Sequence, residues 1–244
     1  MINAHVNTQK VAQNFAKAHA TYGKSAIVQH QMCHTLINLL MANLPDIRPK
    51  SVLEIGCGVG NLTDIYTSIW TLDALYLNDL YDVGIAGANL IIGDIERLDL
   101  PKVDMVLSSS ALQWIKDLPN LFKRIYHTLP KGGVFAFASF GGQNLSQIKA
   151  LTGMGLDYYG MSDIKAMLGV VGFDVIATDQ HQETLYFTHP KDILRHIKDT
   201  GVAVGGRAWT RSSLVAFCDG YDSFATDKGY PLTYDTLFVV AIKP

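Results

Sequence analysis

The chain contains little charge of either sign and few cysteines. Its 244 residues include 20 lysines and arginines, 22 acidic residues and three cysteines, with a formal net charge of −2. This balance lacks the positive excess of proteins that bind nucleic acid, so we expect no nucleic-acid partner. The cysteines, at positions 33, 57 and 218, form neither a disulfide framework nor a C-x-x-C pair. Such usage is typical of the reducing cytoplasm, where we expect this protein to be located.

Long hydrophobic runs are also missing. The longest, such as "LINLLMANL", are too short and too interrupted to cross a bilayer, so no membrane partner is expected. No apolar segment typical of a signal peptide follows Met1. With 48% hydrophobic and 17% charged residues and no internal repeat, the composition indicates one soluble globular domain.

Short apolar runs alternate with segments of helical periodicity. We predict strands over 51–55, 74–78, 89–92, 103–108 and 134–140, and helices over 28–44, 61–70 and 117–129. Strands separated by helices favour a parallel sheet covered on both faces. With right-handed crossovers this is an α/β, doubly wound, Rossmann-like fold.

The stretch "VLEIGCGVGN" places Gly56, Gly58 and Gly60 directly after a buried strand. In such folds ligands bind at the carboxyl ends of the strands. The spacing is G-x-G-x-G and not the dinucleotide pattern G-x-G-x-x-G, and Glu54 precedes it. A carboxylate is a poor neighbour for a phosphate and a good one for a cation. S-adenosylmethionine, which has an ammonium and a sulfonium and no phosphate, fits this pattern.

Two further acids follow the next strands. Asp79 ends the second strand, where a carboxylate can accept hydrogen bonds from ribose hydroxyls, and Asp94 follows the third, where it can accept one from an adenine amino group. Asp82 is an alternative ribose ligand. Each acid alone is equally well explained as a turn residue. Together with the three glycines, they predict a site for S-adenosylmethionine.

The segments "LEIGCGVGNLT", "GDIERLDL", "SSSALQWIKDL" and "LPKGG" resemble class I S-adenosylmethionine-dependent methyltransferases. The segments "FAKAHATYGKSAIVQ", "ILRHIKDTGV" and "GYPLTYDTLFVVAIKP" resemble one family within that class, the malonyl-acyl carrier protein O-methyltransferases of biotin synthesis. The resemblance covers essentially the whole chain. Two departures concern the cofactor pocket: only 14 residues separate Asp79 from Asp94, and Ser109 stands where the family commonly has Asn.

This resemblance implies a mainly parallel seven-stranded sheet with helices on both faces and a helical cap. We expect a single domain, with a core over about 46–188 and 230–244 and a cap over about 1–45 and 189–229. The implied reaction is methylation of the free carboxylate of a malonyl thioester by a cytoplasmic enzyme. The expected partner is an acidic acyl carrier protein or coenzyme A, and the enzyme is expected to be a monomer or weak dimer.

The resemblance also implies further site residues. Tyr22, Gln29, Ile95 and Ser109 are expected to join the cofactor contacts, and Gln113 and Trp114 to border the substrate pocket, although Trp114 is equally explained by packing. Phe15, Tyr22 and Gln29 recur every seven residues and are predicted to share one face of an N-terminal lid helix. For Phe15, packing against the core is the favoured interpretation.

The substrate carboxylate, with a pKa near ~4, is already ionised at neutral pH and needs no general base. It needs cations to hold it. The segment 186–211 has five lysines and arginines against two aspartates, a local charge of +3. Arg207 and Arg211 are the leading candidates for a carboxylate clamp, with Lys198 next, because arginine binds carboxylates bidentately. The same segment is a candidate docking surface for an acidic carrier, and any one of these cations is also explained as a solvated surface residue.

Other patterns lead to weaker hypotheses. His30 and His34 lie one helical turn apart, but Gln31 replaces the glutamate of H-E-x-x-H and no third ligand is evident, so we expect no metal. Two alternative functions remain open. One is a methyltransferase acting on a free small di- or tricarboxylate, and the other is a non-catalytic S-adenosylmethionine-binding subunit.

Overall fold

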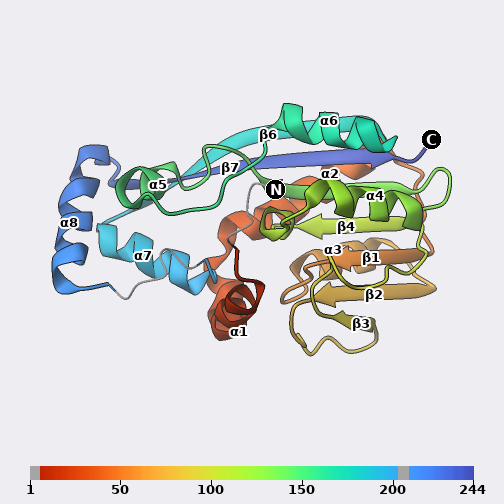
Figure 1. Ribbon diagram of the computed structural model, residues 1–244, viewed down its shortest axis with the longest axis horizontal. Coiled ribbons are helices and arrows are strands. Elements are labelled where there is room, and N and C mark those ends of the chain that lie inside the picture. The colour runs from red at the N-terminus through yellow and green to blue at the C-terminus, as the bar shows by residue number, and fades with distance from the viewer. Residues whose placement is uncertain (1–5, 203–208) are drawn as a thin grey trace.

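A seven-stranded sheet organises the protein. The computed structural model describes residues 6–202 and 209–244, and the strand order is β3-β2-β1-β4-β5-β7-β6 (Figure 1). The strands are β1 Ser51–Ile55, β2 Ala74–Asp79, β3 Asn89–Ile92, β4 Met105–Ser109, β5 Val134–Phe140, β6 Asp174–Phe187 and β7 Tyr230–Ile242. The first five are parallel, and β7 runs antiparallel between β5 and β6. The predicted mainly parallel, doubly wound fold is confirmed.

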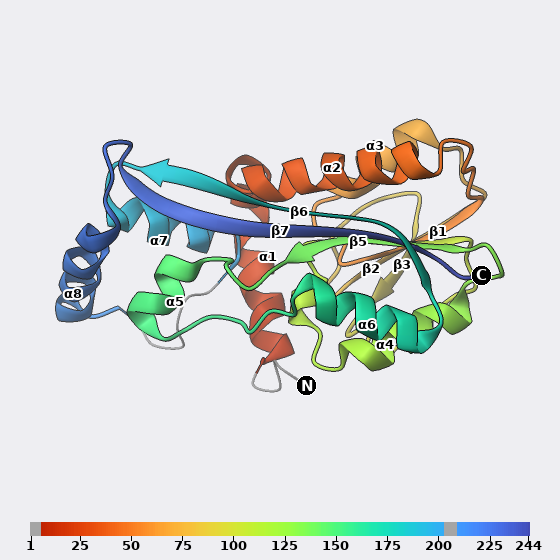
Figure 2. The same cartoon turned by 90° about the horizontal axis from the view of Figure 1, so that it is seen from above.

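Helices cover both faces of the sheet. In Figure 2, α2 (Ile27–Asn43) and α3 (Asn61–Ile69) lie on one side, and α4 (Leu118–Thr128) and α6 (Met161–Val171) on the other. Every residue of β5 is buried, because a central strand with helices on both faces meets no water. Two hydrophobic cores result: one contains Tyr66 and Leu36, and the other contains Phe122 and Phe135.

The hairpin of β6 and β7 extends beyond the parallel strands and carries a small helical end (Figure 1). There lie α5 (Ser146–Thr152), α7 (Pro190–Asp199), α8 (Arg211–Tyr221) and the short η2 (Asp222–Phe224). The helix α1 (Thr8–Ser25) crosses between this end and the carboxyl ends of the parallel strands. It is tied to α7 by Thr21, whose Oγ1 donates to the carbonyl of Asp199 at 3.1 Å. The short η1 (Leu112–Trp114) follows β4.

The prediction that Phe15, Tyr22 and Gln29 share one face of a single helix is wrong. The helix breaks at Ala26, with φ −84° and ψ 49°, and α2 continues in another direction (Figure 2). Phe15 and Tyr22 therefore lie on α1, whereas Gln29 lies buried on α2. A seven-residue spacing places residues on one face only within one unbroken helix, and the turn at Ala26 interrupts the helix.

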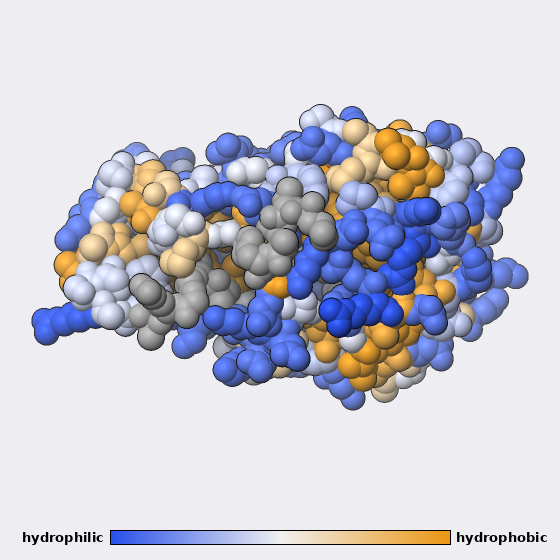
Figure 3. All heavy atoms as spheres, viewed as in Figure 1, coloured by the Kyte–Doolittle hydropathy of each residue, from blue (hydrophilic) through white to orange (hydrophobic). Residues whose placement is uncertain are grey.

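The predicted division into core and cap remains a prediction. In the structure α2 packs against β4, β5, β6 and β7, and its buried face includes Met32, Leu36 and Leu40. Polar residues cover most of the face seen in Figure 3, and an apolar patch lies at the edge strand β3, where Leu90 and Ile92 are exposed. Within residues 6–202 and 209–244, no helix has the length and hydrophobicity needed to cross a membrane.

Candidate active site

The glycine turn after β1 has a backbone that requires glycine. Gly56, Gly58 and Gly60 have φ values of 71°, 53° and 88°, in the left-handed region that L-residues with side chains rarely adopt. A Cβ at Gly56 would lie 2.3 Å from the Cβ of Ala111, whereas a Cβ at Gly58 would meet nothing within 4 Å. The turn therefore packs tightly against the loop after β4 on one side and leaves open space on the other.

Asp79 joins this turn to the end of β2. Its Oδ2 accepts a hydrogen bond from the Gly58 N–H at 2.8 Å, and its Oδ1 accepts one from the Leu80 N–H at 2.7 Å. Burial raises the pKa of this carboxyl group, against the opposing effect of these backbone donors. Asp79 therefore has a structural task in addition to any contact with a ligand.

A cavity of about 890 Å³, counting its open mouth, lies where β1, β2, β3 and β4 end and α1 crosses over them. Its size is typical of small-molecule sites. It brings together these predicted residues: Tyr22, Gly56, Gly58, Asp79, Asp94, Ile95, Ser109 and Trp114. Other residues that no sequence motif marks also line the cavity, among them Val11, His19, Tyr81 and Ser110.

Glu54 lies behind the glycine turn and not on the cavity wall. It is 1% exposed, and its Oε2 accepts hydrogen bonds from Thr63 Oγ1 at 2.5 Å and from the Tyr66 hydroxyl at 2.8 Å. Desolvation raises the pKa of Glu54 to about 7, although both hydrogen bonds oppose the shift. Gly60 and Gln29 also lie outside the cavity wall.

The turn after β4 is held by a side chain. Ser110 has a φ of 57°, unusual for a residue other than glycine, and its carbonyl accepts a hydrogen bond from Gln113 Nε2 at 2.6 Å. Gln113 does not line the cavity, whereas Trp114 does. The predicted pair is thus divided, with Gln113 positioning the turn and Trp114 facing the cavity.

One buried polar atom at this end, the Nε1 of Trp114, has no hydrogen-bond partner among the described residues. The buried Oγ of Ser109 interacts with the Cys33 thiol. Buried polar atoms in native proteins are almost always paired, so the Trp114 N–H on the cavity wall is available to a ligand or water.

The helix α1 forms the roof. Phe15 packs edge-on against Trp114, with 5.8 Å between ring centroids, and against Tyr22 at 6.3 Å. Burial raises the pKa of the Tyr22 hydroxyl. Gly201, just after α7, has a φ of 74°, and a Cβ there would lie 2.6 Å from the Phe15 ring. Phe15 therefore both packs the roof and closes the cavity over Trp114.

The sequence is similar to known methyltransferases. A family model described as a methyltransferase domain matches residues 28–178. The malonyl-acyl carrier protein O-methyltransferase of Acinetobacter baylyi is 38% identical over 249 residues, covering 97% of this chain and 97% of that protein. The corresponding protein of Calditerrivibrio nitroreducens is 35% identical and covers 94% and 95%. The chain belongs to the malonyl-acyl carrier protein O-methyltransferase family.

Solved structures support the fold of this family member. A protein of Bacillus halodurans aligns with a TM-score of 0.64 at 16% identity, covering 86% of this chain and 98% of the other. The N-methyltransferase NodS of Bradyrhizobium japonicum, solved with S-adenosyl-L-homocysteine, aligns with a TM-score of 0.51 at 13% identity and covers 86% of each chain.

The predicted carboxylate clamp is not assembled at the cavity by the described residues of this methyltransferase. Lys198 on α7 and Arg211 at the start of α8 are exposed and do not line it, and Arg207 lies outside the described residues. His19 is the one basic side chain among the described residues of the cavity wall. His30 and His34 are exposed on α2 with ring centroids 5.1 Å apart, and the described residues contain no group of three metal-ligating side chains.

Proposed function

We propose that this protein transfers a methyl group from S-adenosylmethionine to the free carboxylate of a malonyl thioester borne by an acyl carrier protein. The observation that supports this most is the 38% identity with the Acinetobacter baylyi enzyme over 97% of both chains. As the resemblance of the sequence implies, the methyl ester would then enter biotin synthesis in the cytoplasm.

S-adenosylmethionine is the cofactor, and the chemistry of the cavity fits it. The wall carries Asp79, Asp94 and Glu96 and no described lysine or arginine, which suits a cationic ligand and disfavours a phosphate. The space beside Gly58 offers room, and the Ser109 side chain on the wall offers a polar contact. When bound, this cofactor supplies an electrophilic methyl group.

Each acid has a proposed task. We assign the ribose hydroxyls to Asp79, the adenine amino group to Asp94 beside Ile95, and the ammonium to the environment of Glu54 behind the turn. Asp94 is held for this role because its Oδ1 accepts a hydrogen bond from the Glu96 N–H at 3.1 Å. Tyr22 covers the cofactor from α1.

The chain's contribution to the reaction is positioning and removal of water. The malonate carboxylate is already a nucleophile, so its oxygen has only to be aligned with the methyl group and desolvated. Phe15 and Tyr22 exclude water from above, and the Trp114 N–H, buried and without a described partner, is available to the carboxylate. Arg207 remains our proposed clamp. The exposed positions of Lys198 and Arg211 favour a second task for them, docking of an acidic carrier.

The test is to follow methyl transfer to three substrates by mass spectrometry: malonyl-acyl carrier protein, malonyl-coenzyme A and free dicarboxylates. We expect a methyl ester on the malonyl thioesters. Faster methylation of a free dicarboxylate would replace this function with that of a small-acid methyltransferase. Cofactor binding without methylation of any of these substrates would indicate a non-catalytic subunit. Sedimentation of the same sample tests the expected monomer or weak dimer.

A further inference from the structure

A second cavity lies beside the first and shares three residues with it: Val6, Val11 and Trp114. It encloses about 1760 Å³, counting its open mouth. Its wall comes from α1, the end of η1, α5, the loops on both sides of α5 and the two residues 201–202 after α7. These elements meet between the sheet and the helical end (Figure 1). None of the acids proposed to hold the cofactor lines it.

The position of this cavity relative to the first one indicates the path by which a substrate reaches the cofactor. Asp94 marks the β3 end of the first cavity and Trp114 the end after β4. With the ribose and adenine assigned to the β2 and β3 ends, the reacting methyl group falls toward Trp114. The second cavity opens at Trp114, whereas a third one opens at Asp94 and Arg97. A substrate that reaches the methyl group from outside would pass through the second cavity.

The walls of the second cavity are apolar with a few polar groups. Apolar contacts come from Leu145, Ile148, Met154 and Leu156. Within them, Asn144 Nδ2 donates to the Tyr158 hydroxyl at 2.9 Å, which leaves the hydroxyl proton of Tyr158 available to an acceptor. Such walls suit a flexible chain that contains amide groups.

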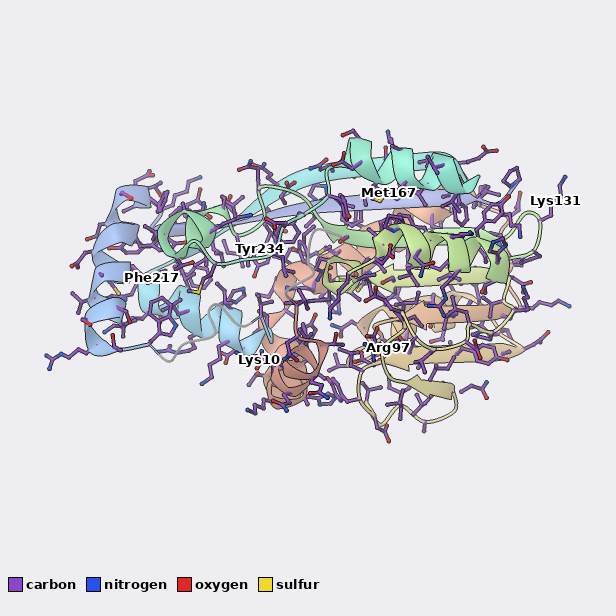
Figure 4. All side chains as sticks on the ribbon, in the orientation of Figure 1. Lys10, Arg97, Lys131, Met167, Phe217 and Tyr234 are labelled. Atoms are coloured by element: carbon purple, nitrogen blue, oxygen red, sulfur yellow. The ribbon has the colours of Figure 1, made fainter. Side chains whose placement is uncertain are left out.

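Two lysines belong to the same wall. Lys10 on α1 and Lys149 on α5 are both exposed, and Figure 4 labels Lys10. Lys149 Nζ lies 2.8 Å from Asp157 Oδ1 in a partly exposed ion pair, and no ion pair involving Lys10 is seen among the described residues. A pair of surface ammonium groups at the edge of an apolar cavity is a suitable partner for a phosphate.

Hydrogen bonds hold the loop before α5, which contributes to this wall. Leu145 has a φ of 53°, and its N–H donates to the Thr233 carbonyl at 2.8 Å. The buried Asp235 accepts a hydrogen bond from the Gln143 N–H through Oδ2 and one from Gln180 Nε2 through Oδ1, each at 2.9 Å. Ser110 and Leu145 are the two residues other than glycine with positive φ in the described chain, and each lines a cavity. Strain of this kind is concentrated at functional sites.

We propose that the second cavity receives the phosphopantetheine arm of the thioester substrate, an amide-containing chain that ends in a phosphate. The thioester end passes Trp114 toward the methyl group, the amides lie beside Asn144 and Tyr158, and the phosphate lies near Lys10 and Lys149. This inference rests on the proposed function, because it assumes a carrier-borne or coenzyme A-borne substrate.

Filling the cavity tests the path of the arm. Asn14 and Met154 line the second cavity and not the first, so Asn14→Trp and Met154→Trp should obstruct it without touching the cofactor. Gln13→Trp, at an exposed neighbour that lines neither cavity, is the matched control. Isothermal titration with coenzyme A and with N-acetylcysteamine, in the presence of S-adenosylhomocysteine, measures binding without requiring turnover.

We expect both blocking variants to weaken coenzyme A binding about tenfold, with S-adenosylhomocysteine binding and the control unchanged. Such a loss would raise the apparent binding free energy by about 1.4 kcal/mol. In methyl transfer, KM for malonyl-coenzyme A should rise similarly, and KM for malonyl-N-acetylcysteamine, which lacks most of the arm, should stay within about twofold. Three results would overturn the proposal that the second cavity receives the arm. They are unchanged coenzyme A binding by the blocking variants, equal losses for both thioesters, and no coenzyme A binding by the wild type.

Variants of the two lysines test the phosphate contact separately from the rest of the arm. Lys10→Ala and Lys149→Ala should weaken coenzyme A binding severalfold at low salt and leave pantetheine, which has no phosphate, unaffected. Lys17→Ala, at an exposed position on α1 outside both cavities, is the control. Equal effects on coenzyme A and pantetheine would contradict the phosphate assignment. If coenzyme A binds as expected but no malonyl thioester is methylated, the proposed function fails and the channel stands.

Discussion

The backbone N–H of Gly58 donates a hydrogen bond to Asp79 Oδ2 at 2.8 Å, so the glycine turn after β1 is held by the acid that ends β2. The same carboxylate accepts a second backbone hydrogen bond, from Leu80 at 2.7 Å, and lines the cofactor cavity. One side chain thus shapes the turn and faces the ligand. Its removal should affect both stability and cofactor binding.

We predict that Asp79→Ala weakens S-adenosylmethionine binding by about 1–3 kcal/mol and lowers the free energy of unfolding by a similar amount, because two partly buried N–H groups lose their acceptor. Calorimetric titration and urea unfolding measure the two effects. Asp82→Ala is the control, since Asp82 is exposed, does not line the cavity and was the alternative ribose ligand. A larger loss of affinity in Asp82→Ala would move the ribose assignment to that residue.

The buried Glu54 should make stability depend on pH. Desolvation raises its pKa from 4.5 to about 7, so between these values the folded protein binds more protons than the unfolded chain. Stability is therefore expected to fall as pH rises from 4.5 through about 7, by about 3 kcal/mol in total. Glu54→Gln should remove this contribution. Urea unfolding of both proteins at pH 5 and pH 8 measures it, and an equal pH dependence in both would contradict the shift.

Cofactor binding should act on the same carboxyl group. If the ammonium of S-adenosylmethionine is stabilised by ionised Glu54, then binding favours the deprotonated form and releases a proton near neutral pH. We expect the affinity of the wild type to rise as pH increases toward 7, and that of Glu54→Gln to be weaker and flat. Titrations in buffers of different ionisation enthalpy count the released protons. If the wild type releases no proton on binding, Glu54 does not stabilise the ammonium.

The strands of the fold could be predicted because continuous apolar runs such as "VFAFASF" have no other stable place than the centre of a covered sheet. The cavity wall was predicted for the same reason: the carboxyl ends of parallel strands meet at one edge, so Asp79, Asp94 and Ser109 had to converge. The break at Ala26 was missed because no glycine or proline stands at the break itself; Gly23 lies three residues before it, inside α1.

The environment of Glu54 could not be predicted, since Thr63 and Tyr66 reach it from α3 only after that helix has packed on the sheet. Two of the three predicted clamp residues, Lys198 and Arg211, do not line the cavity for a related reason. Local charge density in 186–211 fixes no direction for the side chains, and α7 and α8 turn Lys198 and Arg211 to solvent. One available signal was overlooked: Asp235 interrupts the apolar run "LTYDTLFVV", and a carboxylate in a central strand predicts a buried polar network.

The helix α1 should be a lid. It roofs the cavity through Phe15 and Tyr22, and a roof must open for the cofactor to exchange. We predict that amide hydrogen exchange across Thr8–Ser25 slows when S-adenosylhomocysteine binds, and that α2, packed on the sheet, changes little. Phe15→Ala should weaken this protection because it removes the contacts with Trp114 and Gly201. Equal exchange with and without ligand would leave α1 a purely structural helix.

The cations of 186–211 should act by two separable effects. If Arg207 clamps the carboxylate, Arg207→Ala should lower the catalytic rate on malonyl-carrier protein and on malonyl-coenzyme A alike. This loss should persist at high salt. Lys198 and Arg211 are exposed, so their alanine variants should weaken only the carrier-borne substrate, through the loss of attraction to an acidic partner. Kinetics on both thioesters at low and high salt distinguish the two patterns.

Salt decides the docking assignment because exposed charges are screened within about 8–10 Å at physiological ionic strength. Added salt should therefore raise the KM of the wild type for the carrier substrate until it matches the KM of Lys198→Ala and Arg211→Ala. These two substitutions should leave the KM for malonyl-coenzyme A nearly unchanged. Lys165→Ala, at an exposed position on α6, is the matched control for a lysine outside the segment. If Lys165→Ala weakens the carrier substrate as much as the other two, the attraction arises from overall charge and not from this surface. If Arg211→Ala instead slows both thioesters at high salt, Arg211 reaches the carboxylate during turnover and rejoins Arg207 as a clamp.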